Sequence, residues 1–445
     1  MENIHGFDFQ PLQFDRNGNP TSGVEELARH VRDSAATDVV FICHGFRNDE
    51  NDARALYARF LDTFAGNRAR PGVAPQLAPR RFAVGGAFWP SMIFPETNDS
   101  QGGAQSAGAE TQDRQRLEAL KAGLDPQQQA RIDDMISLLS AAAGDQDAQL
   151  QMVAHLLSIV QALPSDDGNE FRSAFDQASA GSLRDALLAG DSLDVSPVGA
   201  GTGGAAGIPG LAVQPALEGG AQSFFGTVFG FVPKFLNLTT FLLMFHRCGE
   251  VGEKGISRAV RSVRNLAPNV RVHLVGHSLG GRAVTACARG LLADPLVQVD
   301  SMMLLQAAYS HFGLSQGGAA HPRGFFRDII ERKVVRGPIL ATHSEHDSVV
   351  GFAYTSMAAV SLNNAKAVGD ENSRFGGIGR NGVLDTRETV QQELNLPGVP
   401  YVFSSGSIHN LNGSRKVQDK PLIASHGDVT SPAVTWAFAS LVAQT

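Results

Sequence analysis

The stretch Arg271-Val-His-Leu-Val-Gly-His-Ser278-Leu-Gly-Gly281 decides the fold of this chain. Its opening residues, Arg271–Val275, predict a short buried strand, and a glycine-flanked serine follows at once. The residues after it, Gly280–Leu292, have the composition of a helix. A strand that passes through a tight turn into a helix is the building unit of a parallel sheet covered by helices.

The same alternation of strand and helix occurs on both sides of this stretch. Upstream, the expected strands are Phe7–Phe14, Asp38–Cys43 and Phe82–Trp89, and the expected helices are Val24–Val31 and Asp52–Phe64. Downstream, strands are expected at Ser301–Ala307, Pro338–Thr342 and Tyr401–Phe403, and a last helix at Val434–Val442. The run Asp38–Cys43 lacks polar alternation, which is typical of a strand buried on both faces. The pattern predicts an α/β protein with a doubly wound, mostly parallel sheet.

A large, mainly helical insertion is expected over residues 96–249, where the composition shifts to Ala, Gln, Asp and Gly. Helical patterns cover Gln112–Leu124, Pro126–Ala141, Ala148–Leu163 and Glu170–Leu188. A glycine-rich connector at 199–220 and a phenylalanine-rich, lid-like segment at 224–245 complete it. We therefore expect a discontinuous core, residues 1–95 and 250–445, interrupted by a cap over its active site.

Composition narrows the class of protein. The chain has 445 residues, of which 43% are hydrophobic and 18% charged, enough apolar material for a large core. Its formal net charge of -7 offers no positive field for nucleic acid, so we expect no nucleic-acid partner. The amino terminus lacks the basic start and apolar stretch of a signal peptide, so the default location is cytoplasmic, with export by a signal-independent route left open.

One segment raises the question of a membrane. Residues 224–245 contain Lys234 as their only charge and are long enough to cross a bilayer. Gly226, Gly230 and Pro233 interrupt the segment, and a crossing there would separate strands that belong to one sheet. We expect no transmembrane segment; the readings left open are a buried helix, or a lid that makes peripheral contact with lipid.

A candidate nucleophile stands at the centre of the opening stretch. The residues Gly276-His277-Ser278-Leu279-Gly280 match the pattern Gly-x-Ser-x-Gly, in which a sharp turn raises a serine above the sheet. The pattern is short and occurs a second time around Ser315. Ser278 is preferred because it follows a strand and precedes a helix, whereas Ser315 is followed by residues typical of a loop.

A serine nucleophile needs a histidine base and a carboxylate that orients it. Beyond the expected strand Pro338–Thr342, Asp347 is the candidate acid and Glu345 its rival. His426 lies between the last expected strand and the last helix and is the candidate base. The less favoured bases are His409, which we expect in a polar loop, and His311.

An oxyanion hole needs two backbone N–H donors. Leu279, directly after the serine, is expected to supply one, and the turn His44-Gly45-Phe46 after an early strand is expected to supply the second from Phe46. The pair His343 and His346 beside Asp347 also suggests a metal site, but no second cluster of ligands accompanies it. We expect neither a metal nor a cofactor.

Together, the His44-Gly45 turn, the Gly-His-Ser-Leu-Gly-Gly stretch, Asp347 and His426 resemble the α/β-hydrolase superfamily, of the lipase and esterase kind. The resemblance implies the chain order serine, acid, histidine. It favours Asp347 over Glu345, because the acid in that superfamily usually precedes a small or polar residue and then valine.

The resemblance implies a hydrolase that cleaves carboxylic esters, with a small-molecule or lipid ester as substrate. The phenylalanines of the lid-like segment favour a hydrophobic acyl chain. Two alternatives stay open. The same triad serves amidases, peptidases and thioesterases, and the fold also occurs in binding proteins that have lost catalysis.

Overall fold

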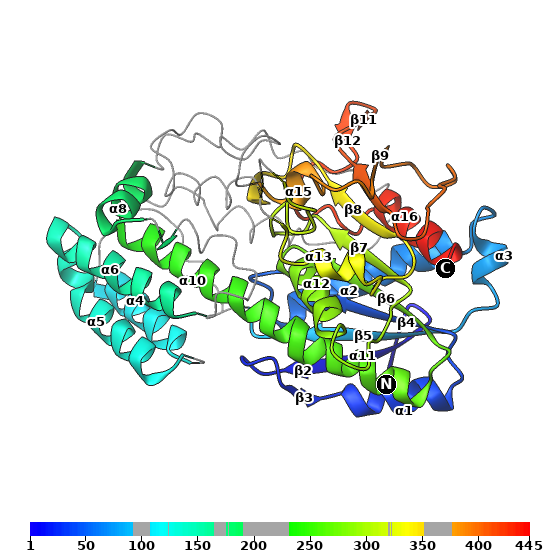
Figure 1. Ribbon diagram of the computed structural model, residues 1–445, viewed down its shortest axis with the longest axis horizontal. Helices are drawn as coiled ribbons and strands as arrows, with labels where there is room; N and C mark the ends of the chain where they lie inside the picture. The colour runs from blue at the N-terminus through cyan, green and yellow to red at the C-terminus, as the bar shows by residue number, and fades with distance from the viewer. Residues whose placement is uncertain are drawn as a thin grey trace, which may run out of the picture.

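A computed structural model of the chain describes residues 1–91, 107–122, 124–163, 175–176, 178–189, 231–318, 321, 323–350 and 376–445. Its centre is a ten-stranded sheet in the order β1-β2-β5-β4-β6-β7-β8-β10-β9, with β3 paired to β2 (Figure 1). The strands are β1 (Glu2–Ile4), β2 (Phe7–Phe14), β3 (Pro20–Ser22), β4 (Asp38–Cys43), β5 (Phe82–Phe88), β6 (Arg271–His277), β7 (Ser301–Leu305), β8 (Ile339–His343), β9 (Thr389–Glu393) and β10 (Ile408–Asn412).

Only β1 and β3 run antiparallel to their neighbour, β2. All the other pairings of this sheet are parallel. The strands β4, β5 and β7 are buried along their whole length, as expected for parallel strands covered on both faces. The prediction of an α/β protein with a mostly parallel sheet is confirmed.

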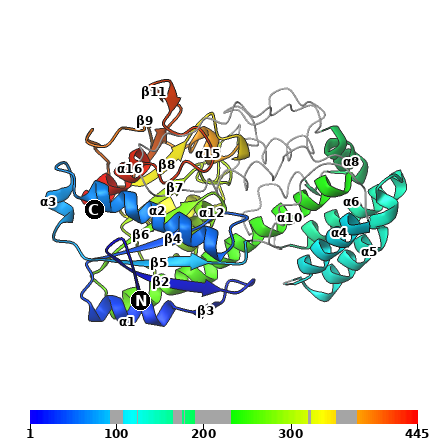
Figure 2. The ribbon, with the colours of Figure 1, turned by 180° about the vertical axis from the view of Figure 1, so that it is seen from behind.

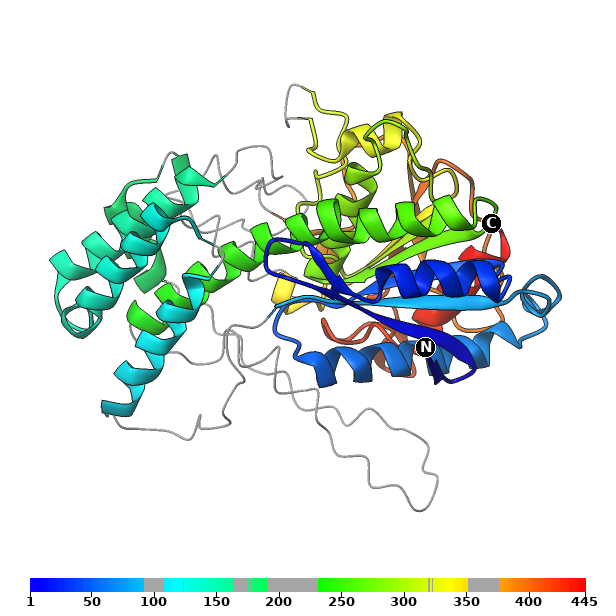
Figure 3. The ribbon, with the colours of Figure 1, turned by 90° about the horizontal axis from the view of Figure 1, so that it is seen from below.

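Helices cover the two faces of the sheet in separate cores. One face packs against α2 (Glu50–Arg68) and α16 (Pro432–Ala443). The other packs against α1 (Val24–Asp33), α11 (Ser257–Leu266) and α12 (Leu279–Gly290). Figure 3 shows the sheet from its edge, with α2 on one side and the long helix that ends in α11 on the other. The short helices are α3 (Ala74–Leu77), α13 (Arg327–Glu331) and α15 (Ile378–Asn381).

The strand order reverses at β4, which lies between β5 on one side and β6 on the other. The helix after β4 (α2) and the helix after β6 (α12) consequently lie on opposite faces of the sheet. The loops that leave these two strands diverge, and a crevice forms at such a point beyond the carboxyl ends of the strands. Ser278 and the turn His44-Gly45-Phe46 both lie here, directly after β6 and β4.

Between β5 and β6 the chain forms a group of helices to one side of the sheet (Figures 1 and 2). Four of them are α4 (Ala107–Leu120), α5 (Pro126–Ala142), α6 (Gln146–Ala162) and α8 (Ala180–Ala189). Asp125 caps α5, and its side chain accepts a hydrogen bond from the N–H of Gln128. The long helix α10 (Phe231–Glu250) joins this group to the sheet and continues through the π-helix η2 (Val251–Ile256) into α11.

The phenylalanine-rich segment lies partly in α10, from Phe231 onward, where most side chains are buried. No helix among the described residues has the length and apolar character needed to cross a membrane. Residues 199–220 and 224–230 lie outside the described part of the chain, as does the first part of the predicted helix Glu170–Leu188.

The prediction of a strand at Tyr401–Phe403 is wrong. These residues are irregular, and the strands that complete the sheet are β9 and β10. Tyr401 and Phe403 are apolar because they pack beneath α16, where the Gln444 side chain bonds to the carbonyl of Tyr401 and to the N–H of Phe403. Local apolar character therefore marked burial under a helix, not membership of the sheet.

Candidate active site

Ser278 has a backbone conformation that serine rarely adopts. Its φ is 58° and its ψ -126°, at the junction of β6 and α12. Its N–H donates to the carbonyl of Leu305 at 3.1 Å, and its carbonyl accepts from the N–H groups of Gly281 (2.9 Å) and Ala308 (3.0 Å). These bonds, to β7, to the residues after it and to α12, hold the strained turn, and such strain is characteristic of functional sites.

Three glycines allow the backbone to approach Ser278 closely. A Cβ atom on Gly276 would lie 2.2 Å from the carbonyl oxygen of Gly280, and one on Gly280 would lie 2.2 Å from that of Cys43. A Cβ atom on Gly45 would lie 2.6 Å from the Cβ of Ser278. All three distances are too short for a real side chain, so the turn after β4 lies directly against the serine.

His426 and Asp347 form a buried pair. Nδ1 of His426 lies 2.9 Å from Oδ2 of Asp347, and the second oxygen, Oδ1, accepts from the N–H of Val350 at 3.0 Å. Asp347 is completely buried and His426 is 7% exposed. A Cβ atom on Gly379 would lie 2.9 Å from Oδ2 of Asp347, so this residue too must be small. A carboxylate in this position fixes the imidazole with Nδ1 protonated and Nε2 available as a base.

The hydrogen bonds of Ser278 and His426 within the described structure do not include one between Ser278 Oγ and His426 Nε2. His426 does lie beside the residue that precedes Ser278, since the rings of His277 and His426 are 4.8 Å apart between centroids. Catalytic hydrogen bonds are often long without substrate and tighten when it binds.

The rival residues have other partners. The Glu345 side chain is 71% exposed and lies 3.6 Å from Nε2 of His346. His409 lies in β10 rather than in the polar loop we expected, and its Nε2 accepts from the N–H of Ser404 at 3.1 Å. Nδ1 of His311 lies 3.0 Å from the side-chain amide of Asn381.

Ser315, the second serine of the Gly-x-Ser-x-Gly pattern, lies in a loop as predicted. Its hydroxyl donates to Oδ2 of Asp385 at 2.7 Å and accepts from the N–H of Gly317 at 2.9 Å. The side chain is completely buried. These contacts give it a role in closing its own loop.

Side chains hold the turn after β4. His44 is buried and stacks on Trp89 with ring centroids 5.6 Å apart, and burial lowers its pKa to about 4. The ring is therefore neutral at pH 7, and its Nδ1–H donates to the carbonyl of Gly45 at 2.9 Å. The side-chain amide of Asn48 donates to the carbonyls of Gly45 (3.2 Å) and Phe46 (3.3 Å). With these carbonyls engaged, the peptide planes of the turn have a fixed orientation.

Leu279 is the first residue of α12 and is completely buried. The first N–H groups of a helix have no intrahelical acceptor, and the helix dipole places partial positive charge there. This end of α12 therefore suits an oxygen that acquires negative charge beside Ser278.

Aromatic side chains connect α10 to this region. The rings of Phe46 and Phe241 meet edge to face at 6.4 Å, and Phe245 lies 6.0 Å from Phe241. The guanidinium of Arg247 donates to the carbonyl of Pro90, just after β5, at 2.8 Å. The helix α10 thus packs against the segments that follow β4 and β5.

Gln306 is a site residue that the sequence did not suggest. It directly follows β7, is completely buried, and has a φ of 45°. Its Nε2–H donates to the carbonyl of Ser425, the residue before His426, at 2.8 Å. The available signal was a polar residue near the end of the apolar run Ser301–Ala307, at the sheet edge where Ser278 lies.

No group of three or more His, Cys, Asp or Glu side chains in the described residues is arranged to hold a metal ion. Burial lowers the pKa of His343 to about 4, so that this ring is neutral at pH 7. No family model matches the chain, and no curated protein or solved structure matches it with significance. The case for a function therefore depends on the geometry of Ser278 and its neighbours.

Proposed function

We propose that this chain is a serine hydrolase of the α/β-hydrolase type, of the lipase and esterase kind, which cleaves carboxylic esters through an acyl-enzyme on Ser278. One observation carries the proposal. A serine with a φ of 58° joins a buried parallel strand to a helix, at the same edge of the sheet as a histidine whose Nδ1 lies 2.9 Å from a buried carboxylate.

In the first half of the reaction, His426 Nε2 takes the proton of the Ser278 hydroxyl while Oγ attacks the carbonyl carbon of the ester. Asp347 accepts the hydrogen bond of Nδ1–H and stabilises the imidazolium that forms. The tetrahedral intermediate collapses when the bond to the leaving oxygen breaks. His426 donates its proton to that oxygen, and an alcohol departs.

Negative charge on the carbonyl oxygen needs donors that are already oriented. The N–H of Leu279, at the start of α12, and the N–H of Phe46, in the turn fixed by His44 and Asn48, are assigned to this role. The close approach of Gly45 to Ser278 supports the assignment, because it places the turn that carries Phe46 directly against the serine.

In the second half, water replaces the alcohol. His426 removes a proton from the water as its oxygen attacks the acyl carbon, and the same N–H donors stabilise the second intermediate. Collapse releases the carboxylic acid and returns the proton from His426 to Ser278. No metal or cofactor takes part in any of these steps.

The aromatic contacts beside the turn support a preference for hydrophobic acyl chains. Phe46 carries one assigned donor and packs edge to face against Phe241, which in turn contacts Phe245. An acyl group bound at this donor would meet the rings of Phe46 and Phe241. The substrate class we propose is therefore a small-molecule or lipid ester with an apolar acyl chain.

A fluorophosphonate probe tests the nucleophile. The wild-type chain should be labelled on Ser278, and Ser278→Ala should not be labelled. Ser315→Ala is the matched control, because Ser315 has the same short pattern but bonds to Asp385. Labelling of Ser278→Ala, or none of the wild type, would contradict the proposal.

A panel of esters, amides and thioesters with matched acyl groups tests the reaction class. We expect the esters to have the highest kcat/KM, rising from acetate to longer acyl chains. Faster turnover of the amides or thioesters would assign the same triad to a peptidase, amidase or thioesterase. Turnover highest on acetate esters would contradict the apolar acyl site.

A further inference from the structure

The segment that carries His426 lacks regular secondary structure. Residues 422–431 contain neither helix nor strand, between the short strand β12 (Lys420–Pro421) and α16. Inside the segment, Oδ2 of Asp428 accepts from the N–H groups of Ala424 (2.8 Å) and Ser425 (2.9 Å). These bonds shape the loop locally but do not attach it to the sheet that carries Ser278.

His277 attaches this loop to the nucleophile strand. It is the last residue of β6, directly before Ser278, and its Nε2 lies 3.0 Å from the carbonyl oxygen of His426. A carbonyl oxygen only accepts, so Nε2–H of His277 is the donor. The two rings also face each other, with centroids 4.8 Å apart and an angle of 39° between their planes.

His277 keeps a neutral ring in this position. Burial, reinforced by the neighbouring His426, lowers its pKa to about 3. With Nε2 protonated, Nδ1 carries no proton, and this buried atom has no hydrogen-bond partner in the described structure. A neutral neighbour suits a base that becomes positively charged, because a second cation 4.8 Å away would oppose protonation of His426.

Gln306, which directly follows the neighbouring strand β7, makes the second attachment. Its Nε2–H donates to the carbonyl of Ser425 at 2.8 Å, and its backbone N–H donates to Oγ1 of Thr342 at 3.1 Å. Its φ of 45° is uncommon for a residue other than glycine. Asp347 supplies the third contact, to the His426 side chain. The backbone on both sides of the His426 Cα is thus held by side chains from two adjacent strands.

We propose that His277 and Gln306 are positioning residues, which fix the imidazole of His426 through hydrogen bonds to the carbonyl oxygens of His426 and Ser425. The inference rests on the proposed function, since it assumes that His426 is the general base. Neither side chain reacts with substrate. Their contribution is to keep His426 Nε2 within reach of Ser278 Oγ, on a loop that has no regular structure of its own.

Two substitutions of His277 test its hydrogen bond to the carbonyl of His426, because they place the side-chain N–H at different positions. The side-chain amide of glutamine places an N–H about where Nε2 lies, whereas asparagine places it nearer Nδ1. We expect His277→Asn to lower kcat for an ester about 10- to 100-fold, because a base displaced by about 1 Å loses this much. The value of KM should change less than about threefold, because the bond acts on the base and not on bound substrate. His277→Gln should recover most of kcat.

Gln306→Met tests the second bond with little change in volume. We expect a similar fall in kcat with KM retained. This variant tests the positioning of His426 even if His277→Asn does not fold. His273→Asn is the matched control, since His273 is a completely buried histidine at the opposite edge of the sheet. This variant should lower the melting temperature and leave kcat within about twofold.

Equal kcat for His277→Asn and His277→Gln would overturn the role of His277, and wild-type kcat in Gln306→Met would overturn that of Gln306. Fluorophosphonate labelling separates these failures from a failure of the proposed function. If Ser278 of the wild-type chain is not labelled, the proposed function fails, and with it the role of His426 as general base. If the wild type is labelled and the variants are labelled at the same rate, only the positioning role of His277 and Gln306 fails.

Discussion

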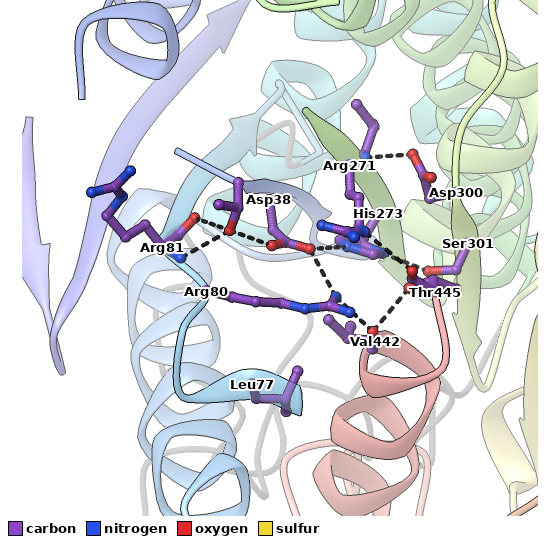
Figure 4. A network of polar contacts seen from close by, with 12 residues as sticks. Asp38, Leu77, Arg80, Arg81, Arg271, His273, Asp300, Ser301, Val442 and Thr445 are labelled. Atoms are coloured by element: carbon purple, nitrogen blue, oxygen red, sulfur yellow. Dashed lines mark hydrogen bonds and ion pairs between the residues drawn. The ribbon is translucent and has the colours of Figure 1, made fainter. Parts of the chain in front are cut away.

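Two sets of serine, histidine and aspartate lie at opposite edges of the same sheet. At the carboxyl edge are Ser278, His426 and Asp347. At the amino edge, His273 Nδ1 lies 2.8 Å from Ser301 Oγ, and its Nε2 lies 3.0 Å from Asp38 Oδ1 (Figure 4). By hydrogen bonds alone, the amino-edge set is the more complete triad.

The two sets differ in the exposure and backbone setting of the serine and in the histidine nitrogen that faces the carboxylate. Ser301 is the first residue of the buried strand β7 and has no exposed surface, nor do His273 and Asp38. Ser278 stands on a strained turn against the start of a helix, with 7% of its surface exposed. The nitrogens are reversed too, since His273 uses Nε2 for its carboxylate and His426 uses Nδ1.

The neighbours of the amino-edge set indicate a structural role. Thr37 Oγ1 donates to Asp38 at 2.6 Å. The Arg80 guanidinium donates to Asp38 at 3.1 Å and to the carbonyl of Val442 at 2.8 Å (Figure 4). Arg271 donates to the backbone carbonyl of Thr445 at 3.1 Å. The network joins three strands to the end of α16, and a nucleophile needs access and oriented donors that this edge does not offer.

Replacement of each serine by alanine should give the largest difference in activity between the two sets. Ser278→Ala removes the proposed nucleophile and should lower kcat/KM for a chromogenic ester about 10⁴-fold or more. Ser301→Ala should leave it within about twofold, because Ser301 is buried in β7. Initial rates on purified, folded variants decide this, and a large loss of activity in Ser301→Ala would refute the comparison.

Substitution of Asp347 should mainly reduce activity, whereas substitution of Asp38 should mainly reduce stability. Asp347→Asn should lower kcat about 10³- to 10⁴-fold with little loss of stability, since the amide favours the wrong tautomer of His426. Asp38→Asn leaves Arg80 beside a neutral side chain, and we expect the free energy of unfolding to fall by roughly 3 kcal/mol. Urea unfolding and ester assays should show opposite rankings of the two variants. The same ranking in both measurements would be the contrary result.

The contact between Phe46 and Phe241 near the carboxyl edge allows a test of the proposed preference for long acyl chains. Phe241→Ala removes the ring that packs against Phe46, and should lower kcat/KM for long-chain esters about tenfold while acetate esters change little. Phe235→Ala, on the same helix but stacked on Phe231, is the control. An equal effect of Phe241→Ala on short and long esters would remove the acyl site from this helix.

The two edges should also lose stability in different ranges of pH. Burial lowers the pKa of His44 to about 4, that of His277 to about 3 and that of His343 to about 4, all below the usual 6.5. The unfolded chain takes up these protons first, so the free energy of unfolding should fall as the pH drops from about 6.5 towards 4. Each histidine contributes at most about 1.4 kcal/mol per pH unit.

Asp38 also contributes stability that is lost as the pH falls, but over a lower range of pH. Burial raises its pKa, but its hydrogen bonds to His273 and Thr37 and its charged neighbours lower it more, so the net pKa lies below 3.8. Its contribution is present above pH 3.8 and is lost only as the pH falls through that lowered pKa.

Urea unfolding between pH 7.5 and 4 tests the contribution of His277. The free energy of unfolding should fall less steeply with decreasing pH for His277→Gln than for the wild type, because the variant lacks the histidine with the lowered pKa. Identical slopes would show that the pKa of His277 does not differ between the folded and unfolded states.

Much of the sheet follows from local sequence. The boundaries of β2 and β4 agree with the runs Phe7–Phe14 and Asp38–Cys43, because strands buried on both faces need continuous apolar residues or clear alternation. The strand β10, with the sequence Ile-His-Asn-Leu-Asn, was not predicted. Its buried Asn410 bonds to both backbone groups of Val383, a partner that no local pattern reveals.

By itself the sequence determined the α/β class, the strand, turn and helix around Ser278, and the preference for Ser278 over Ser315, since these depend on short-range periodicity and sterics. Only the tertiary structure decided that Asp347 lies 2.9 Å from His426, that His273 forms a second, buried set with Ser301 and Asp38, and that Gln306 reaches Ser425. The physical reason is that a hydrogen bond between residues far apart in the chain depends on strand order and loop path, which apolar patterns do not specify.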